Sequence, residues 1–110
     1  MLKIEAIIRS SKLYDVQAAL ADAGIDTFTS FEVKLSGLHK GHQGLRNKTS
    51  DFISKSKIEI LCPDQDREKT VQAILGAAKT GDRGDGIIFV CQIDNLIKIR
   101  DSKTGEAALK

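Results

Sequence analysis

The chain has 110 residues, with 17 lysines and arginines against 15 aspartates and glutamates, and it contains one proline. This length fits a single domain, residues 1–110, with a modest core that oligomerisation would help to stabilise. The net charge of +2 is too small to indicate nucleic-acid binding, and no apolar run approaches the ~20 residues that span a bilayer.

The first part of the chain predicts a strand followed by a helix. Residues 2–9, LKIEAIIR, alternate in the pattern of a half-buried strand. The next residues repeat apolar side chains at helical spacing, with Ser10 or Ser11 as the N-terminal cap and Gly24 as the end. The apolar side of this helix consists of Leu13, Val16, Leu20 and Ala23.

A second strand and a long loop follow. Residues 26–35, DTFTSFEVKL, are rich in β-branched and aromatic residues and predict a strand. Residues 36–56 lack sustained periodicity and hold three glycines, two histidines and several cations. Long loops in small domains are usually functional or disordered, so we expect a mobile interaction loop here.

The second half of the chain predicts strand, helix and strand again. Residues 57–62 alternate before Pro63, and Asp64 or Asp66 begins a helix that Gly81 ends. The apolar side of this helix consists of Val71, Ile74, Leu75 and Ala78. Residues 87–93, IIFVCQI, predict a strand that is apolar on both faces, and residues 98–110 form a loop or tail after a short extra strand or turn.

The order of these elements, βαββαβ, predicts an α+β ferredoxin-like sandwich. Right-handed crossovers place both helices on one face of a four-stranded antiparallel sheet. The other face of the last strand would then be wet, yet residues 87–93 leave it apolar. A symmetric homo-oligomer is the simplest cover for that face.

The cysteines and histidines indicate neither disulfides nor a metal site. Cys62 and Cys91 lie in apolar runs, where buried free thiols are expected. His39 and His42 have HxxH spacing, but two ligands without a third are too few for a metal. Charges interrupt the apolar residues after Met1, so no secretory segment is expected and we predict a cytoplasmic protein.

Several segments together resemble the PII signal-transduction family. They are KIEAII…KL..V..AL...GI from Lys3, T..EVK..G..KGH from Thr29, KIEI..PD from Lys57, and AA.TG..GDG.IFV…I.KIR from Ala77. The resemblance covers nearly the whole chain, in order. It implies a homotrimer that binds ATP or ADP between subunits, usually with 2-oxoglutarate beside Mg-ATP. It also implies that the long loop docks onto a transporter, enzyme or regulator, without catalysis.

The resemblance also implies a set of site residues. The positions that match nucleotide-binding residues of the family are Ile7, Thr29, Gly37, Leu38, Glu59, Leu61, Gly84, Asp85, Gly86, Lys98 and Arg100. His39 and Lys55 match positions close to the effector and the Mg²⁺ ion. No catalytic or resident metal-binding residue is implied.

Departures from the family predict weaker ligand binding. Ile87 stands where a lysine usually follows GDG, and His39 stands where a glutamine usually precedes KGH. Lys98 replaces the first of two arginines, Arg100 keeps the second, and residues 9–11 replace KPF. We therefore expect weaker nucleotide binding than in a typical member, and a weak or lost 2-oxoglutarate response.

The chemistry of the glycine-rich stretch agrees with phosphate binding, although a plain turn has the same residues. Glycines let backbone N–H groups approach an anion closely, and successive amides form a concave donor site. Arg100 offers a bidentate fork and Lys98 a point charge, both on one side of a short strand, or else on a solvated edge. Arg83 or Lys103 would be substitutes for the cation lost at Ile87.

Three other functions compete with the sensor. A trimeric adaptor with a decayed nucleotide site would keep the fold and the loop. An RNA-binding module is disfavoured, since aromatic residues make up only 5% of the chain and no stacking pair is evident. An enzyme is disfavoured because no nucleophile–base pair or convergent carboxylates can be identified.

Overall fold

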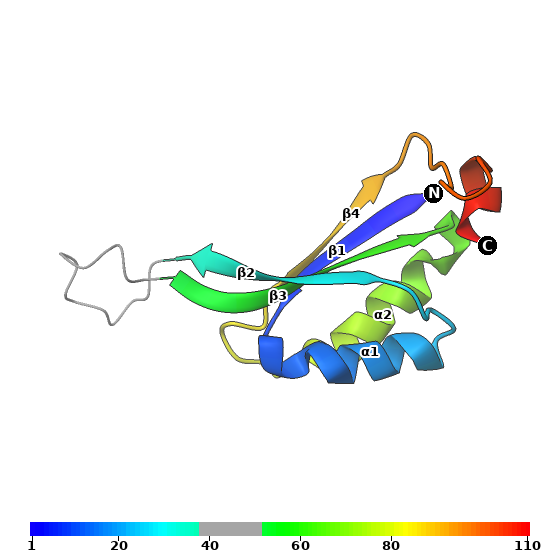
Figure 1. Ribbon diagram of the computed structural model, residues 1–110. Coiled ribbons are helices and arrows are strands. Elements are labelled where there is room, and N and C mark those ends of the chain that lie inside the picture. Colours follow the sequence, from blue (N-terminus) through cyan, green and yellow to red (C-terminus); the bar gives the residue numbers. More distant parts are fainter. Residues whose placement is uncertain (38–51) are drawn as a thin grey trace.

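The computed structural model describes residues 1–37 and 52–110 and confirms the ferredoxin-like α+β fold (Figure 1). The strands are β1 Leu2–Ile8, β2 Thr29–Ser36, β3 Phe52–Cys62 and β4 Ile87–Gln92, and the α-helices are α1 Leu13–Asp22 and α2 Arg67–Ala78. Short 3-10 helices are η1 Ser10–Lys12, η3 Asp64–Asp66 and η4 Gly105–Leu109. The sheet order is β2-β3-β1-β4, and every neighbouring pair is antiparallel.

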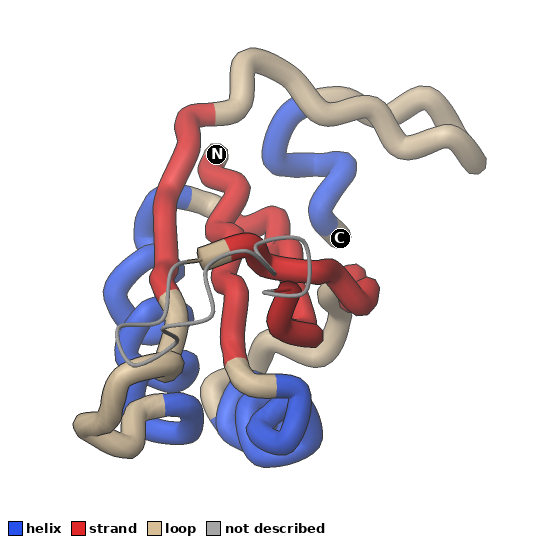
Figure 2. The backbone as a smooth tube through the Cα atoms, turned by 90° about the vertical axis from the view of Figure 1, so that its left-hand side faces the viewer, coloured by secondary structure: helices blue, strands red, loops and turns tan. Residues whose placement is uncertain are grey.

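The core lies between the sheet and the two α-helices, which cover the same face of the sheet (Figure 2). Because side chains of a strand alternate between faces, every second residue of β1 enters this core. The buried apolar side chains are Leu2, Ile4, Ala6, Ile8, Val16, Leu20, Ile58, Ile60, Cys62, Ile74 and Ala78. The predicted faces of both helices are therefore largely confirmed, although Leu75 is exposed.

The helix ends differ from the prediction. Ser10 and Ser11 lie in η1, and no side-chain cap is formed at the start of α1. The Ser10 hydroxyl instead donates to the Glu32 carboxylate at 2.9 Å, and Ser56 donates to the other oxygen of that carboxylate at 2.6 Å. The helix α2 ends at Ala78 rather than at Gly81, because Lys79 is already extended.

The strand β3 is longer than the sequence suggested. Residues 52–56, predicted to belong to the long loop, pair with β2 from Ser36↔Phe52 to Glu32↔Ser56. The last pair that β3 makes with β1 is Ile8↔Ser56, so the strands beyond it form a two-stranded arm, residues 33–36 and 52–55, outside the main sheet (Figure 1). The turn residues of the expected loop lie outside the described residues.

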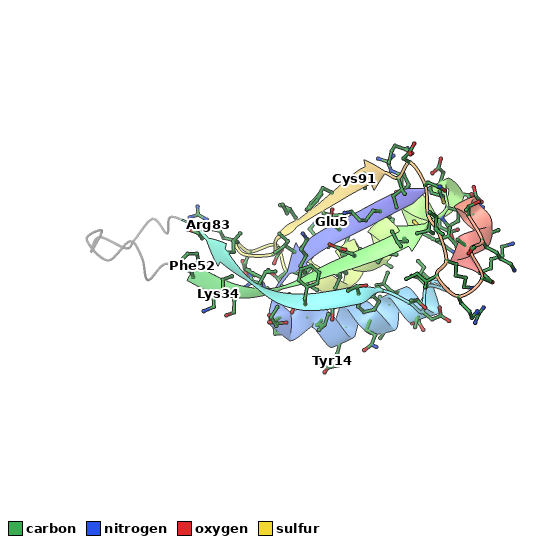
Figure 3. The ribbon with its side chains drawn as sticks, turned by 45° about the horizontal axis from the view of Figure 1, so that its top comes forward. Glu5, Tyr14, Lys34, Phe52, Arg83 and Cys91 are labelled. Atoms are coloured by element: carbon green, nitrogen blue, oxygen red, sulfur yellow. The ribbon has the colours of Figure 1, made fainter. Side chains whose placement is uncertain are left out.

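The face of the sheet opposite the helices, called here the open face, carries exposed apolar side chains. Ile87 is 61% exposed and Phe89 is 37% exposed. Cys91 also lies on this face and is exposed, so the prediction that it is buried in the single chain is wrong, because the helices cover only the other side. Figure 3 shows Glu5 and Cys91 on the open face and Tyr14 on the helix side.

The segment after β4 forms a turn rather than a regular extra strand. Its only bridge pair among the described residues is Ile97↔Thr104, and the Gly105 N–H donates to the Leu96 carbonyl at 3.0 Å. The chain then forms η4 at the end of the sheet that also holds the N-terminus (Figure 1). In the described residues, no helix has the length and apolar character needed to cross a bilayer.

Candidate functional site

The stretch Thr80–Gly86, called here the glycine bend, connects α2 to β4. Gly81, Gly84 and Gly86 have φ values of +91°, +103° and +99°, a region that side chains disfavour. The Asp85 carboxylate organises the bend from inside: it accepts the Thr80 and Gly81 backbone N–H groups, each at 2.9 Å, and the Thr80 hydroxyl at 2.6 Å. These bonds, those from Thr80 foremost, hold the pKa of Asp85 well below its usual range.

Two of these glycines allow close contacts that a side chain would prevent. A Cβ atom at Gly86 would lie 1.8 Å from the Ile7 carbonyl oxygen, and one at Gly84 would lie 3.1–3.3 Å from the Arg9 guanidinium. The Lys55 ammonium donates to the Gly84 carbonyl at 2.5 Å, and Lys55 is only 4% exposed. The structure thus brings Ile7, Lys55, Gly84, Asp85 and Gly86 together, which we call the bend half-site.

A second group of predicted residues lies elsewhere on the open face. Thr29 pairs with Glu59 across β2 and β3, and Leu61 follows on the same side of β3. These three residues line a hollow of about 250 Å³, called here the C-terminal half-site. The rest of its wall comes from Thr27, Phe28, Leu96, Ile97, Ala108 and Leu109.

The two half-sites are separated along the sheet. Leu61 pairs with Lys3, whereas the bend half-site lies at Ile7, four residues further along β1, which corresponds to roughly 13 Å. Within one subunit, the two half-sites are therefore distinct hollows and surfaces rather than one pocket.

The predicted cations Lys98 and Arg100 lie in the turn after β4, near the C-terminal half-site. They do not share one side of a strand, because the chain turns at residues 99–101. The Lys98 ammonium donates to the Lys110 carbonyl, whereas Arg100 is exposed. Of the two cations, Arg100 is thus the one that extends into solvent.

The remaining predicted residues fall at or beyond the end of the arm. Gly37 follows β2 and has no atom within 4 Å of a Cβ built on it. Leu38, His39 and His42 lie outside the described residues. In the two ranges that the structure covers, no group of three His, Cys, Asp or Glu side chains could hold a metal ion.

Comparison with known proteins identifies the family. The sequence profile described as "Nitrogen regulatory protein P-II" matches residues 1–103. The chain belongs to the P-II family. It is 45% identical over 112 aligned positions to the nitrogen regulatory protein P-II of Rhodobacter capsulatus, covering 99% of this chain and 100% of the relative. The corresponding identities are 41% for the Rhizobium meliloti protein and 44% for P-II 1 of Escherichia coli K12, with the same coverage.

Membership of the P-II family makes this protein a signal-transduction regulator and confirms the resemblance on which the site residues were assigned.

The sequence reasoning missed one residue that contacts the glycine bend. Arg9 was noted only as a departure from KPF, but its side chain reaches Asp85 and the Arg83 carbonyl. No local pattern identifies such a contact, because 74 to 76 residues separate the partners.

A charged cluster on the open face was also missed. The Glu5 carboxylate is 5% exposed and accepts the Lys57 ammonium at 2.9 Å and the Lys3 ammonium at 3.3 Å. The hydrogen bond from Lys57 is the main cause that lowers the pKa of Glu5. Alternation along the strand predicted that Lys3 and Glu5 share a face, but the sequence does not reveal that Lys57 lies beside them.

Proposed function

We propose that this P-II protein is a non-enzymatic cytoplasmic regulator that senses ATP and ADP in the clefts of a homotrimer. The observation that carries the proposal is the division of the predicted nucleotide residues into two half-sites on one face. Each half-site holds only part of what an adenylate needs. The C-terminal half-site offers a hollow with both polar and apolar walls for the base, and the glycine bend offers backbone donors for phosphates.

The open face supports assembly of three copies. Its exposed apolar side chains include Phe31, Leu61, Ile87 and Phe89. The charges beside them are already paired, since Glu5 accepts both Lys3 and Lys57. Because paired charges cost less to bury than single ones, this face is suited to an interface between subunits.

Arg100 supplies the main phosphate-binding cation of the proposed cleft, reaching the glycine bend of the neighbouring subunit. Its guanidinium can bind two phosphate oxygens at once. Mg²⁺ would accompany ATP and share its phosphate charge. Because Ile87 stands where a lysine is usual and Lys98 binds the Lys110 carbonyl, nucleotide affinity should be below that of a typical member.

The long loop would dock onto the regulated protein, which we expect to be a transporter, a metabolic enzyme or a transcription regulator. Nucleotide at the base of the loop would favour the conformations that the partner binds. A 2-oxoglutarate response should be weak or lost. His39 stands where the family usually has a glutamine that helps to hold the metal and 2-oxoglutarate.

Calorimetry tests the proposal directly. The intact protein is titrated with ATP, ADP and AMP, each with and without Mg²⁺ and 2-oxoglutarate. We expect ATP and ADP to bind at micromolar to millimolar concentrations, with little enhancement by 2-oxoglutarate. The absence of heat from ATP and ADP at millimolar concentration would refute nucleotide sensing, and a large enhancement would refute the weak 2-oxoglutarate response.

A second function, a trimeric adaptor with a decayed nucleotide site, is favoured by two observations. Ile87 presents an apolar side chain beside the glycine bend, and the Lys98 ammonium donates to the Lys110 carbonyl. Arg100→Ala separates the two functions. A sensor loses nucleotide-dependent partner binding, whereas an adaptor is unaffected, and Arg67→Ala, on the exposed side of α2, serves as the control with the same charge change.

A further inference from the structure

Arg9 contacts the glycine bend with its side chain at three consecutive residues, 83, 84 and 85. It follows β1 directly, and its side chain is about one-third exposed. Its Nε donates to an Asp85 carboxylate oxygen at 3.3 Å, and an Nη donates to the Arg83 carbonyl at 2.7 Å. One guanidinium thus contacts both a side chain and a main-chain group of the bend.

The Gly84 contact fixes where the guanidinium lies. A Cβ atom at Gly84 would be 3.1 Å and 3.2 Å from the two Nη atoms and 3.3 Å from Cζ, so the whole guanidinium faces this glycine. Real Cβ atoms rarely have neighbours this close, so only glycine fits without displacing the arginine. The bend therefore follows the surface of the Arg9 side chain between residues 83 and 85.

The hydrogen bonds within the bend determine which of its backbone N–H groups remain without a partner. Asp85 binds the Thr80 and Gly81 N–H groups, and the Thr80 hydroxyl accepts from the Asp82 N–H at 3.1 Å. Among the described residues, the N–H groups of Arg83, Gly84 and Gly86 have no hydrogen-bond acceptor. Those three amides are the donors that an anion could use.

We propose that Arg9 is a positioning residue for phosphate binding, acting through Asp85 and the Arg83 carbonyl to hold these amides in one orientation. This role rests on the proposed function. Both hydrogen-bond partners of Arg9 belong to the bend itself, so the role does not require contact with the ligand. An arginine fork suits this role better than an ammonium because the two acceptors, a carboxylate and a carbonyl, lie on different residues.

The first test needs no nucleotide. Amide hydrogen exchange is followed by NMR in the intact wild type and in Arg9→Ala, Arg9→Lys and Lys12→Ala. Lys12 lies in the adjoining η1. Within residues 1–37 and 52–110, its ammonium forms an ion pair only with the exposed Asp15, at 3.9 Å, so its variant is the control. We expect Thr80, Gly81 and Asp82 to exchange about tenfold faster in Arg9→Ala, while Ile58 and Ile60 keep their protection.

The second test measures ATP affinity in the same four proteins. Arg9→Ala should bind ATP about tenfold more weakly, because it loses hydrogen bonds in which one partner is charged. Arg9→Lys should be intermediate, since an ammonium can reach one acceptor but lacks the fork. Lys12→Ala should equal the wild type.

The two tests separate failure of this inference from failure of the proposed function. If wild type binds no ATP, nucleotide sensing is wrong, and hydrogen exchange alone decides whether Arg9 holds the bend. If Arg9→Ala leaves both exchange and affinity unchanged, Arg9 has no positioning role. If it speeds exchange at Ile58 and Ile60 equally, Arg9 stabilises the whole fold rather than the bend, and the inference is also overturned.

Discussion

Gly86 occupies a position where the backbone leaves no room for a side chain. Its φ is +99°, and a Cβ atom would lie 1.8 Å from the Ile7 carbonyl oxygen, so either Gly86 or the end of β1 must move when a side chain is added. Gly86→Ala should therefore lower the free energy of unfolding by roughly 2–4 kcal/mol. Urea unfolding at fixed protein concentration measures the change.

Gly76 provides the control for that substitution. It lies inside α2, and a Cβ built on it has no atom within 4 Å. Because alanine favours a helix more than glycine does, Gly76→Ala should raise stability by about 0.5–1 kcal/mol. If both variants change stability in the same direction, the strain assigned to Gly86 is wrong.

Glu5 should make stability depend on pH. The pKa of Glu5 is lower in the folded protein than in the unfolded chain, where it is about 4.3. The ionised carboxylate therefore stabilises the fold fully above about pH 4.3. This contribution is lost as the pH falls through the lower pKa of the folded protein. Glu5→Gln should therefore cost about 1 kcal/mol at pH 7 and progressively less below about pH 4. Urea unfolding at several pH values tests this, with exposed Glu106→Gln as a control that should change little at any pH.

At the residue scale, the sequence identified glycines and cations by type but not by contact. Gly84 and Gly86 could be assigned to a bend because their spacing and residue type indicate positive φ. The Asp85 carboxylate accepts hydrogen bonds inside the bend only because the turn has one particular geometry. Lys55 contacts the Gly84 carbonyl although the two residues are 29 positions apart in the sequence. Such contacts become visible only after the chain has folded.

The arm of β2 and β3 is the element whose extent was least predictable. The polar residues 54–56 interrupt the apolar alternation that marked residues 57–62 as a strand, so the sequence suggested a loop there. The pairs from Val33↔Lys55 to Ser36↔Phe52 nevertheless form a ribbon, because β2 supplies hydrogen-bond partners that no local pattern reveals. The helices and the inner strands were predicted well, since each buries a regular apolar face.

A two-stranded ribbon should be less stable than the sheet that it extends. It lies beyond the last β1–β3 pair, and its Leu35 and Phe52 side chains are largely exposed. Amides at the outer end of the arm, residues 35–36 and 52–53, should exchange with solvent at least about tenfold faster than those of Ile58 and Ile60, since few buried contacts oppose local opening. NMR-detected exchange measures this, and equal protection throughout β3 would contradict the prediction.

The whole molecule has one covered and one uncovered sheet face, and this asymmetry leads to a prediction about assembly. The wild type should have the mass of three chains in light scattering after gel filtration. Phe89→Asp should reduce that mass to one chain, because a charge on the open face would be buried unpaired in the interface. Tyr14 is 79% exposed on the helix side, so Tyr14→Asp should leave the mass unchanged.

The outcome that would contradict this prediction is a Phe89→Asp protein that keeps the wild-type mass. In that case the open face would not form the subunit interface, and the two half-sites would need another arrangement to meet. A monomeric wild type would remove the basis for a cleft between subunits. Circular dichroism should confirm that both variants retain the fold, so that a change of mass reports assembly.

The sequence by itself determined the fold class, the order of the elements and the family, because alternation, helical spacing and glycine-rich turns are local properties of a chain. Only the tertiary structure decided that the predicted site residues form two separate half-sites, that Arg9 and Lys55 contact the glycine bend, and that β3 extends into an arm. The reason is physical: these features depend on strand register and on contacts between distant residues, and neither is encoded in any single stretch of sequence.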